Sequence, residues 1–417
     1  MRQPILSAII FLLIGVVLTA LPGSFGQTPT SAGANASAAT IPAKPRDLTK
    51  LTIQQRNFYV SGQRGMEWLQ RANRPDGRFV GGFVPALRLA MEEDGYVRQA
   101  GAAFALARTA RFYRDDRATA IAKQALLTLL LETSLDPARQ VRTIPIHQAN
   151  PLAFAGMLLA AIHELPAPAA DLLDQGDQIA NLLRTHIRED SFLSVALSGE
   201  EAAAIQTETV QHYSGPALYA LIRSQTLRPA AWKLEALRKA RPYYDAYWKQ
   251  NKNMPMLAWH TAAYTEGYLV TRDPGFAETV FDMNDWLCGL QYQQSLPARA
   301  SWVGGFQPWT DGKAAPVAPD ISSAAAVLSL AEACRLARAA GDVQHYQRYR
   351  QALENGLQFL TTLQYSEANT QHFADWYRPA LVGGFHASRQ DGNLRLDYAQ
   401  NALSALVQYL RHVADVP

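Results

Sequence analysis

The triplet Gly-Gly-Phe occurs three times in this chain of 417 residues, beginning at Gly81, Gly304 and Gly383. Each copy follows a helix-like stretch that ends in a bulky residue and an amide, and each precedes a stretch rich in small residues. A helix, a glycine loop and a second helix, repeated along a chain, is the pattern of helical-hairpin repeats, which bury their apolar faces against one another. The triplet therefore predicts an all-α fold built from helix pairs.

Apolar residues recur at helical spacing from about residue 52 onward, and no alternating run predicts a strand. Proline and glycine separate the helical stretches, so we expect about ten to twelve helices, alternately bulky and rich in small residues. Small residues at 102–103 and 324–326 suit an inner ring where helices converge. We therefore predict a closed α/α toroid, an inner ring of helices inside an outer ring. An open solenoid is the alternative, which the lack of a polar capping repeat disfavours.

The first 26 residues have the pattern of a secretory signal peptide. Arg2 supplies a positive charge, residues 5–21 are almost all apolar, and residues 24–26 (Ser-Phe-Gly) offer small residues to a signal peptidase. An uncleaved membrane anchor is the alternative, because the apolar stretch approaches the length of a short span. Residues 27–46, rich in Ala, Ser, Thr and Pro, predict a flexible linker before a toroid domain at 47–417. We expect an exported protein, periplasmic or extracellular, which meets a membrane only through its N-terminal segment.

Charge and cysteine content exclude several classes of protein. The formal net charge is +3 and no run of Lys or Arg stands out, so we expect no nucleic-acid partner. The two cysteines, Cys288 and Cys334, are too few for a disulfide scaffold. One bridge between them and two buried free thiols both remain open. No metal-binding motif and no phosphate-binding glycine loop is present, so we expect no metal and no cofactor.

One segment resembles the repeat of the terpenoid cyclase and protein prenyltransferase toroid superfamily. Residues 65–70 (Gly-Met-Glu-Trp-Leu-Gln), Asn73 and residues 76–79 (Asp-Gly-Arg-Phe) match a helix with an aromatic-Leu pair, an amide, then Asp-Gly and an aromatic. Residues 283–291 and 356–364 are weaker copies. The resemblance implies the toroid fold. It does not imply that family's chemistry, because the DxDD acid motif and the zinc ligands of prenyltransferases are absent.

A second resemblance is to the helical-barrel domain of uronyl C5-epimerases and related glycan-processing toroids. It rests on residues 395–398 (Arg-Leu-Asp-Tyr) followed by Gln400 and Asn401. This resemblance implies a glycan ligand.

In a toroid, the N-termini of the inner helices and the loops beside them face a common cavity, so polar residues there are the candidates for a site. Candidate catalytic residues are His212, Tyr213, Glu208, His260, Glu266 and Asp397. Candidate substrate-binding residues are Tyr96, Arg98, Gln99, Trp302, Trp309, Asp320, Trp376, His386, Arg395 and Gln400.

These residue types suit carbohydrate chemistry. Proton abstraction beside a uronic carboxylate needs a Tyr or His base and an Arg or Gln to hold the acid. Glycoside hydrolysis needs two carboxylates, to be found among Glu208, Glu266, Asp320 and Asp397. Structural readings stay open as well: Asp320 and Asp397 precede helices, where a carboxylate caps free N–H groups, and the His and Trp residues suit ordinary packing.

These observations together predict an exported polysaccharide-processing protein of epimerase, lyase or hydrolase type. Its site is expected at the mouth of a helical toroid, and its ligand is expected to be a glycan or another small molecule. A non-catalytic toroid scaffold that binds a glycan or a protein is the alternative. A third possibility is a terpenoid-cyclase relative that lacks the acid motif, which would have a dry aromatic cavity.

Overall fold

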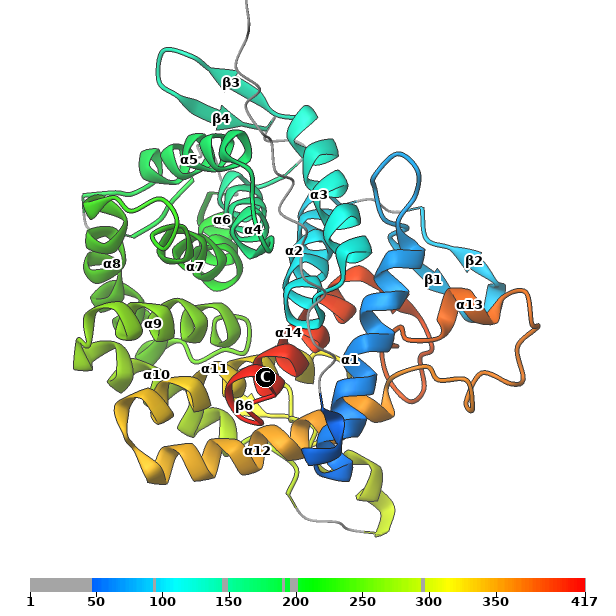
Figure 1. Ribbon diagram of the computed structural model, residues 1–417. Coiled ribbons are helices and arrows are strands. Elements are labelled where there is room, and N and C mark those ends of the chain that lie inside the picture. The colour runs from blue at the N-terminus through cyan, green and yellow to red at the C-terminus, as the bar shows by residue number, and fades with distance from the viewer. Residues whose placement is uncertain are drawn as a thin grey trace, which may run out of the picture. The chain divides into compact units, whose positions relative to one another are not determined.

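The computed structural model describes residues 47–92, 95–144, 149–189, 192–195, 202–293 and 297–416 (Figure 1). The predicted signal peptide and linker, residues 1–46, lie outside the described residues. Within the described ranges, no helix combines the length and the apolar character that a membrane crossing requires.

One set of helices forms a closed inner ring. Its members, in chain order, are α2 (Tyr96–Tyr113), α4 (Pro151–Glu164), α7 (Ser214–Ser224), α9 (Leu257–Thr271), α11 (Ser323–Ala340) and α14 (Leu396–His412). Each helix packs against the next one, and α14 packs against α2. Figure 1 shows them arranged around a common centre. The contact between the last helix and the first closes the ring, so the open solenoid is excluded and the predicted α/α toroid is confirmed.

A second set of helices covers the ring from outside. Its members are α1 (Ile53–Ala72), α3 (Asp116–Leu131), α5 (Ala170–Thr185), α8 (Ala231–Gln250), α10 (Pro274–Cys288) and α12 (Val343–Thr362). Helix α1 packs on α14 and α2, and each of the others packs on the inner helix that precedes it in the chain. Each hairpin therefore buries one inner helix behind one outer helix.

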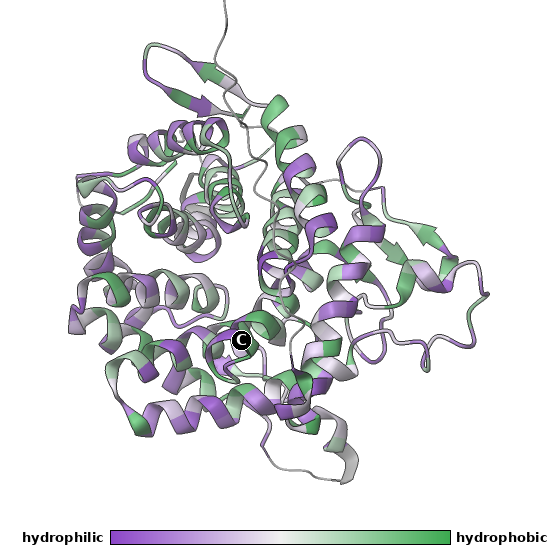
Figure 2. Cartoon of the chain, in the orientation of Figure 1, coloured by the Kyte–Doolittle hydropathy of each residue, from purple (hydrophilic) through white to green (hydrophobic). Residues whose placement is uncertain are grey.

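Burial on all sides explains why the inner helices contain so many small residues. Every residue of α4 from Leu152 to Glu164 is buried, and the alanines at 102–103 of α2 are fully buried. A helix that is apolar all round needs neighbours on every face, which the ring and its outer layer supply. The outer helices are amphipathic instead, and Figure 2 shows hydrophilic residues along α8 and α12.

The two kinds of connection between helices differ in length. Connections from an inner to the next outer helix are short, such as residues 114–115 and 341–342. Most connections from an outer to the next inner helix are long, such as residues 289–322 and 363–395. The long connections therefore gather where the inner helices begin, and we call this end of the ring the mouth.

Short strands lie within the long connections, although the sequence predicted none. They are β1 (Gly82–Val84), β2 (Leu89–Ala90), β3 (Ser134–Asp136), β4 (Val141–Thr143), β5 (Trp309–Thr310), β6 (Lys313–Ala314) and β7 (Leu394–Arg395). Strands β2, β1 and β7 form one antiparallel sheet, while β3–β4 and β5–β6 form separate antiparallel pairs. Strands of two or three residues are too short to show an alternating pattern, so the sequence carries no signal for them.

The structure corrects the register of the first glycine repeat. In the other two repeats, Gln291 and Gln364 donate a hydrogen bond from Nε2 to the carbonyl oxygens of Gly304 (3.0 Å) and Gly383 (2.9 Å). In the first repeat, Asn73 Nδ2 donates instead to the carbonyl of Gly77 (2.9 Å).

The backbone conformation identifies the same glycines. The φ angle is +88° at Gly77, +88° at Gly304 and +93° at Gly383, a left-handed region that glycine occupies without a steric penalty. The counterpart of Gly-Gly-Phe in the first repeat is therefore residues 77–79 (Gly-Arg-Phe), and the triplet at Gly81 enters strand β1 instead.

Cys288 and Cys334 are both free and buried, at the end of α10 and inside α11. Of the two alternatives that the sequence left open, the structure has the free thiols.

Candidate functional site

A cavity of about 420 Å³ lies at the mouth of the toroid, where α9, α11 and α14 begin. It is lined by His212, Met254, Pro255, Ala258, Trp259, Asp320, Ile321, Ser322, Ala325, Ala387, Asp397, Tyr398 and Asn401. Its volume falls within the range of pockets that hold small organic ligands. Three predicted site residues, His212, Asp320 and Asp397, come together in its wall.

The first turn of α14 carries an ion pair. The guanidinium of Arg395 donates from Nε and Nη2 to the two carboxylate oxygens of Asp397, at 3.0 Å each. Arg98, from the first turn of α2, lies 3.9 Å from the same carboxylate. Strand β7 fixes this arrangement, because Arg395 pairs with Gly82 of β1 immediately before the helix starts. The orientation of the Asp397 carboxylate is therefore fixed.

The second carboxylate, Asp320, precedes α11. Its Oδ1 accepts hydrogen bonds from the backbone N–H of Ser322 (2.9 Å) and from the Ser322 hydroxyl (2.5 Å). No other described residue donates a hydrogen bond to the Asp320 carboxylate or forms an ion pair with it. Its Oδ2 is thus available to a ligand.

Tyr398 lies near both carboxylates. Burial raises the pKa of its phenol, Arg395 acts in the opposite direction, and Asp397, Asp391 and Asp320 raise the pKa further. The phenol therefore stays protonated at neutral pH, as a hydrogen-bond donor.

His212 enters the wall from a π-helical turn, η3 (Thr209–Tyr213), which joins α6 (Ala202–Glu208) to α7. Single π-turns inside α-helices are frequent at functional sites. Desolvation lowers the pKa of the His212 imidazole, and Glu208 opposes this shift. Glu208 also accepts a hydrogen bond from the Tyr213 hydroxyl (2.6 Å), so these two predicted catalytic residues pair with each other beside the cavity.

Trp259 lines the cavity from the first turn of α9, and the prediction of site residues missed it. Its indole packs against the rings of Phe104 and Tyr219, with centroids 5.5 and 5.4 Å away. Because three inner helices hold these rings, the indole is fixed in place. The available sequence signal was its position directly before His260, at the start of an inner helix.

Asn401 is a second lining residue that the prediction missed. Its Oδ1 is buried and accepts no hydrogen bond within the described structure. Leaving a buried acceptor unpaired costs about 1–3 kcal/mol. Asn401 follows Asp397 by four residues, which places both on one face of α14, and that spacing was the available signal.

Two predicted catalytic residues lie deeper in the ring. His260 is fully buried, between the hydroxyls of Ser214 (3.0 Å from Nε2) and Tyr264 (3.2 Å from Nδ1). Burial lowers its pKa to about 3, so the ring is neutral. Glu266 lies in the second half of α9, away from the mouth, and forms ion pairs with Arg335 (2.8 Å) and Arg223 (3.3 Å).

Glu266 belongs to a buried group of charges that we call the axial ion cluster. Its members are Arg108, Glu164, Arg223, Glu266, Glu332 and Arg335, contributed by α2, α4, α7, α9 and α11. Burial raises the pKa of Glu266, but Arg335 and Arg223 outweigh this effect and hold its pKa below the ordinary value. The cluster links α2, α4, α7, α9 and α11 to one another.

The predicted substrate-binding residues outside the cavity have structural partners. Tyr96 donates to the carbonyl of Leu129 (2.7 Å), and the amide of Gln99 bonds both the N–H and the carbonyl of Phe79 (2.7 Å each). Gln400 is buried against Gly101. His386 Nδ1 lies 2.7 Å from the carbonyl oxygen of Ser388, next to the lining residue Ala387.

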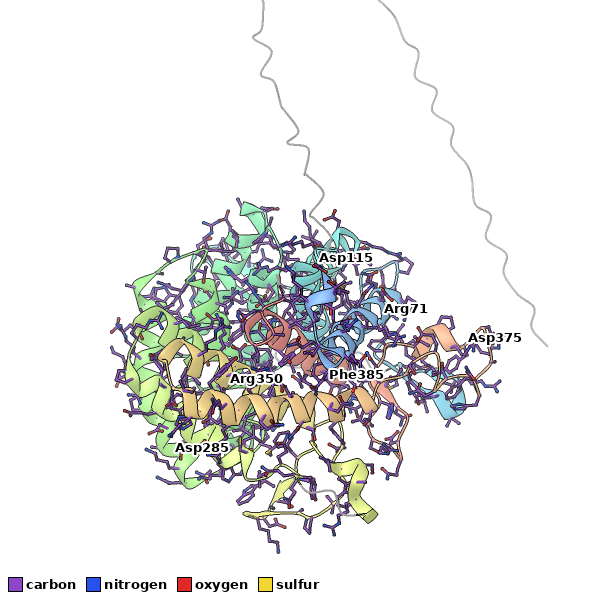
Figure 3. All side chains as sticks on the ribbon, turned by 60° about the horizontal axis from the view of Figure 1, so that its bottom comes forward. Arg71, Asp115, Asp285, Arg350, Asp375 and Phe385 are labelled. Atoms are coloured by element: carbon purple, nitrogen blue, oxygen red, sulfur yellow. The ribbon has the colours of Figure 1, made fainter. Side chains whose placement is uncertain are left out.

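The three predicted tryptophans also lie outside the cavity wall. Trp302 packs on Tyr292 (5.2 Å) and Trp309 on Trp286 (5.1 Å). Trp376 is 70% exposed. It adjoins Asp375, which Figure 3 shows at the edge of the molecule.

Among the residues that the structure describes, no group of three or more His, Cys, Asp or Glu is placed to hold a metal ion.

Neither protein-family models nor curated proteins gave a match to this sequence. Solved structures do match. An unsaturated glucuronyl hydrolase specific for heparin aligns with a TM-score of 0.58 and 13% identity, over 86% of this chain and 98% of its own. A sugar epimerase from a ruminal bacterium aligns with a TM-score of 0.60 and 8% identity, over 87% and 100%. The α-1,6-mannanase from Salegentibacter sp. HEL1_6 aligns with a TM-score of 0.58 and 9% identity, over 85% and 99%.

These matches share the fold of this chain, and at such identities they establish the fold alone. The α/α toroid implied by the sequence resemblances is thus confirmed, and glycan-processing enzymes are among the proteins that have it.

Proposed function

We propose that this protein is an exported glycan-processing enzyme that cleaves a glycosidic bond in the mouth cavity. The observation that carries this proposal is the convergence of two carboxylates, Asp320 and Asp397, with the indole of Trp259 in one cavity. Glycoside hydrolysis uses a pair of carboxyl groups, and a fixed indole offers a flat apolar surface to the C–H face of a sugar ring. Structurally similar toroids include a glucuronyl hydrolase and an α-1,6-mannanase.

The surroundings of the two carboxylates suggest different roles for them. Asp397 is oriented by its ion pair with the guanidinium of Arg395 at 3.0 Å, which suits a base or nucleophile. Asp320 forms no ion pair with a described residue and has an uncommitted oxygen, which suits the proton donor to the leaving group. Tyr398 stays protonated and is thus a poor base, which disfavours a tyrosine-based lyase or epimerase.

The test is turnover by single variants. We expect Asp320→Asn and Asp397→Asn each to lower kcat/KM by roughly 10²-fold or more on a glycan that the wild-type protein cleaves. Asp311→Asn is the matched control, because Asp311 lies in the β5–β6 turn outside the cavity, at a positive φ that Asn tolerates. If both cavity variants keep wild-type turnover while they fold normally, this function is refuted.

A non-catalytic glycan-binding toroid is the second candidate. It is favoured by the bonds that Asp397 and Asp320 make to Arg395 and Ser322, since both carboxylates have structural partners. This candidate predicts that the wild-type protein binds a glycan without releasing any product from it. A lyase would instead release an unsaturated product, and an epimerase would leave the glycosidic bond intact.

Export rests on the pattern of residues 1–26. N-terminal sequencing of protein recovered from outside the cytoplasm should begin at Gln27, after the predicted cleavage site. An intact N-terminus at Met1 in a membrane fraction would favour the anchor instead.

A further inference from the structure

The charged groups that line the mouth cavity are of one sign. Its wall contains the carboxylates of Asp320 and Asp397 and, among the described residues, no arginine or lysine. The nearby cations are already engaged: Arg395 makes two hydrogen bonds to Asp397, and Arg98 lies 3.9 Å from the same carboxylate. A ligand that carried a carboxylate or a sulfate would therefore enter a wall in which no described arginine or lysine can pair with its charge, and burying an unpaired charge is costly.

The cavity also offers hydrogen-bonding groups that suit the hydroxyl groups of a sugar. Asn401 Oδ1 is a buried acceptor without a donor, and the other buried side-chain atoms that lack a partner in the described structure belong to residues outside this wall. Asp320 Oδ2 is a second acceptor in the same cavity. Sugar hydroxyls are donors, and each would satisfy one such acceptor. The protonated phenol of Tyr398 offers a donor to a third oxygen.

We propose that the cavity selects a neutral sugar unit over the corresponding uronic acid unit, and that Asn401 Oδ1 accepts a hydrogen bond from one hydroxyl of that sugar. This inference rests on the proposed function, because it assumes that the cavity binds a glycan. It also changes the role expected of Arg395, which was predicted to bind substrate and instead orients Asp397. Asn401 becomes a specificity-determining residue.

The experiment compares matched pairs of methyl glycosides in binding to the full protein by titration calorimetry. The pairs are glucose with glucuronic acid, galactose with galacturonic acid, and mannose with mannuronic acid. In any pair that binds, we expect the neutral member to bind at least about tenfold more tightly. Equal or tighter binding of the uronic acid would overturn the proposed selectivity.

Variants of Asn401 test its role separately. Asn401→Leu should weaken binding of the neutral sugar about tenfold and should raise the thermal midpoint of the free protein, because the unpaired acceptor is gone. Asn401→Asp keeps an acceptor oxygen at this position, so it should retain most of the affinity for the neutral sugar. Unchanged affinity of Asn401→Leu for the neutral sugar would show that Asn401 has a purely structural role. That result would overturn the proposed hydrogen bond from a sugar hydroxyl to Asn401.

Failure of this inference differs from failure of the proposed function. Binding of uronic acids to a protein that still needs Asp320 and Asp397 for turnover would refute the selectivity and leave the function standing. If none of the sugars binds and no glycan is cleaved, both are refuted.

Discussion

Gly156 of the inner helix α4 lies against the backbone of α7, and replacing it with alanine tests the closed ring. A Cβ atom at this position would lie 2.8 Å from the backbone N of Ala217, 2.9 Å from the carbonyl carbon of Pro216 and 3.1 Å from Cα of Ala217. All three atoms belong to the backbone of α7, so no side-chain rotation relieves the overlap. The two helices must move apart, and their packing with the rest of the ring must loosen.

The magnitude follows from two opposing effects. Alanine is favoured over glycine inside a helix by about 1 kcal/mol. Overpacking a well-filled core costs about 1–3 kcal/mol, and sometimes more. Because a closed ring resists the separation of one helix pair, we expect the upper end of that cost. Gly156→Ala should therefore lower the free energy of unfolding by about 2 kcal/mol.

Gly176→Ala is the matched control, since it makes the same change in a helix of the outer layer. A Cβ at Gly176 would meet only side-chain atoms, the nearest being Cδ1 of Leu159 at 3.4 Å, an ordinary contact distance. We expect this variant to gain up to about 1 kcal/mol from helix propensity. Urea unfolding at pH 7.5, followed by circular dichroism, measures both variants. If Gly156→Ala were as stable as the wild-type protein, α4 and α7 would not be packed as described.

Three further predictions concern stability and reactivity. Glu164→Ala should destabilise the protein by about 3–5 kcal/mol in urea unfolding, because it removes the buried carboxylate that pairs with the guanidinium of Arg108 at 2.9 Å. A loss below about 1 kcal/mol would contradict this account of the axial ion cluster. His163 is buried, and neither of its ring nitrogens makes a hydrogen bond within the described structure. Burial, together with Lys233 and Arg223, lowers its pKa from 6.5 to about 3. The native state therefore keeps the imidazole neutral, while the unfolded state takes up a proton below pH 6.5. The free energy of unfolding should thus fall as the pH falls from 6.5 toward 3, by about 1.4 kcal/mol per pH unit for this group, and His163→Leu should remove that share. If the variant and the wild-type protein lose stability with the same slope between about pH 6.5 and 5, His163 does not contribute. Cys288 and Cys334 should react with a thiol reagent only after unfolding, and rapid labelling of the native protein would place them at the surface instead.

The sequence predicted the architecture well because its signals are local and repeated. Glycine loops, helical periodicity and alternating bulky and small helices each occur several times, so one misread copy does not change the fold. The first copy was in fact misread: Asn73 identifies Gly77 as its partner, whereas the triplet at Gly81 lies nearby and is more conspicuous. The short strands at the mouth left no periodic signal at all.

Predicting the site from sequence was harder, because a site depends on which face each residue presents. Asp320, Asp397 and His212 were found through their positions at the starts of inner helices. Glu266 stands on another inner helix, α9, but in its second half, where it joins the axial ion cluster instead. Trp302, Trp309 and Trp376 were chosen for their residue type. The indole that does reach the cavity, Trp259, depends on the packing of three helices.

The most direct test of the central claim is a crystal structure of the Asp397→Asn variant with a bound neutral oligosaccharide. We predict density for a sugar ring in the mouth cavity, stacked on Trp259, with hydroxyl groups within hydrogen-bonding distance of Asp320 and Asn401. Density only outside the cavity, for example along the loop that carries Trp376, would contradict the proposed site.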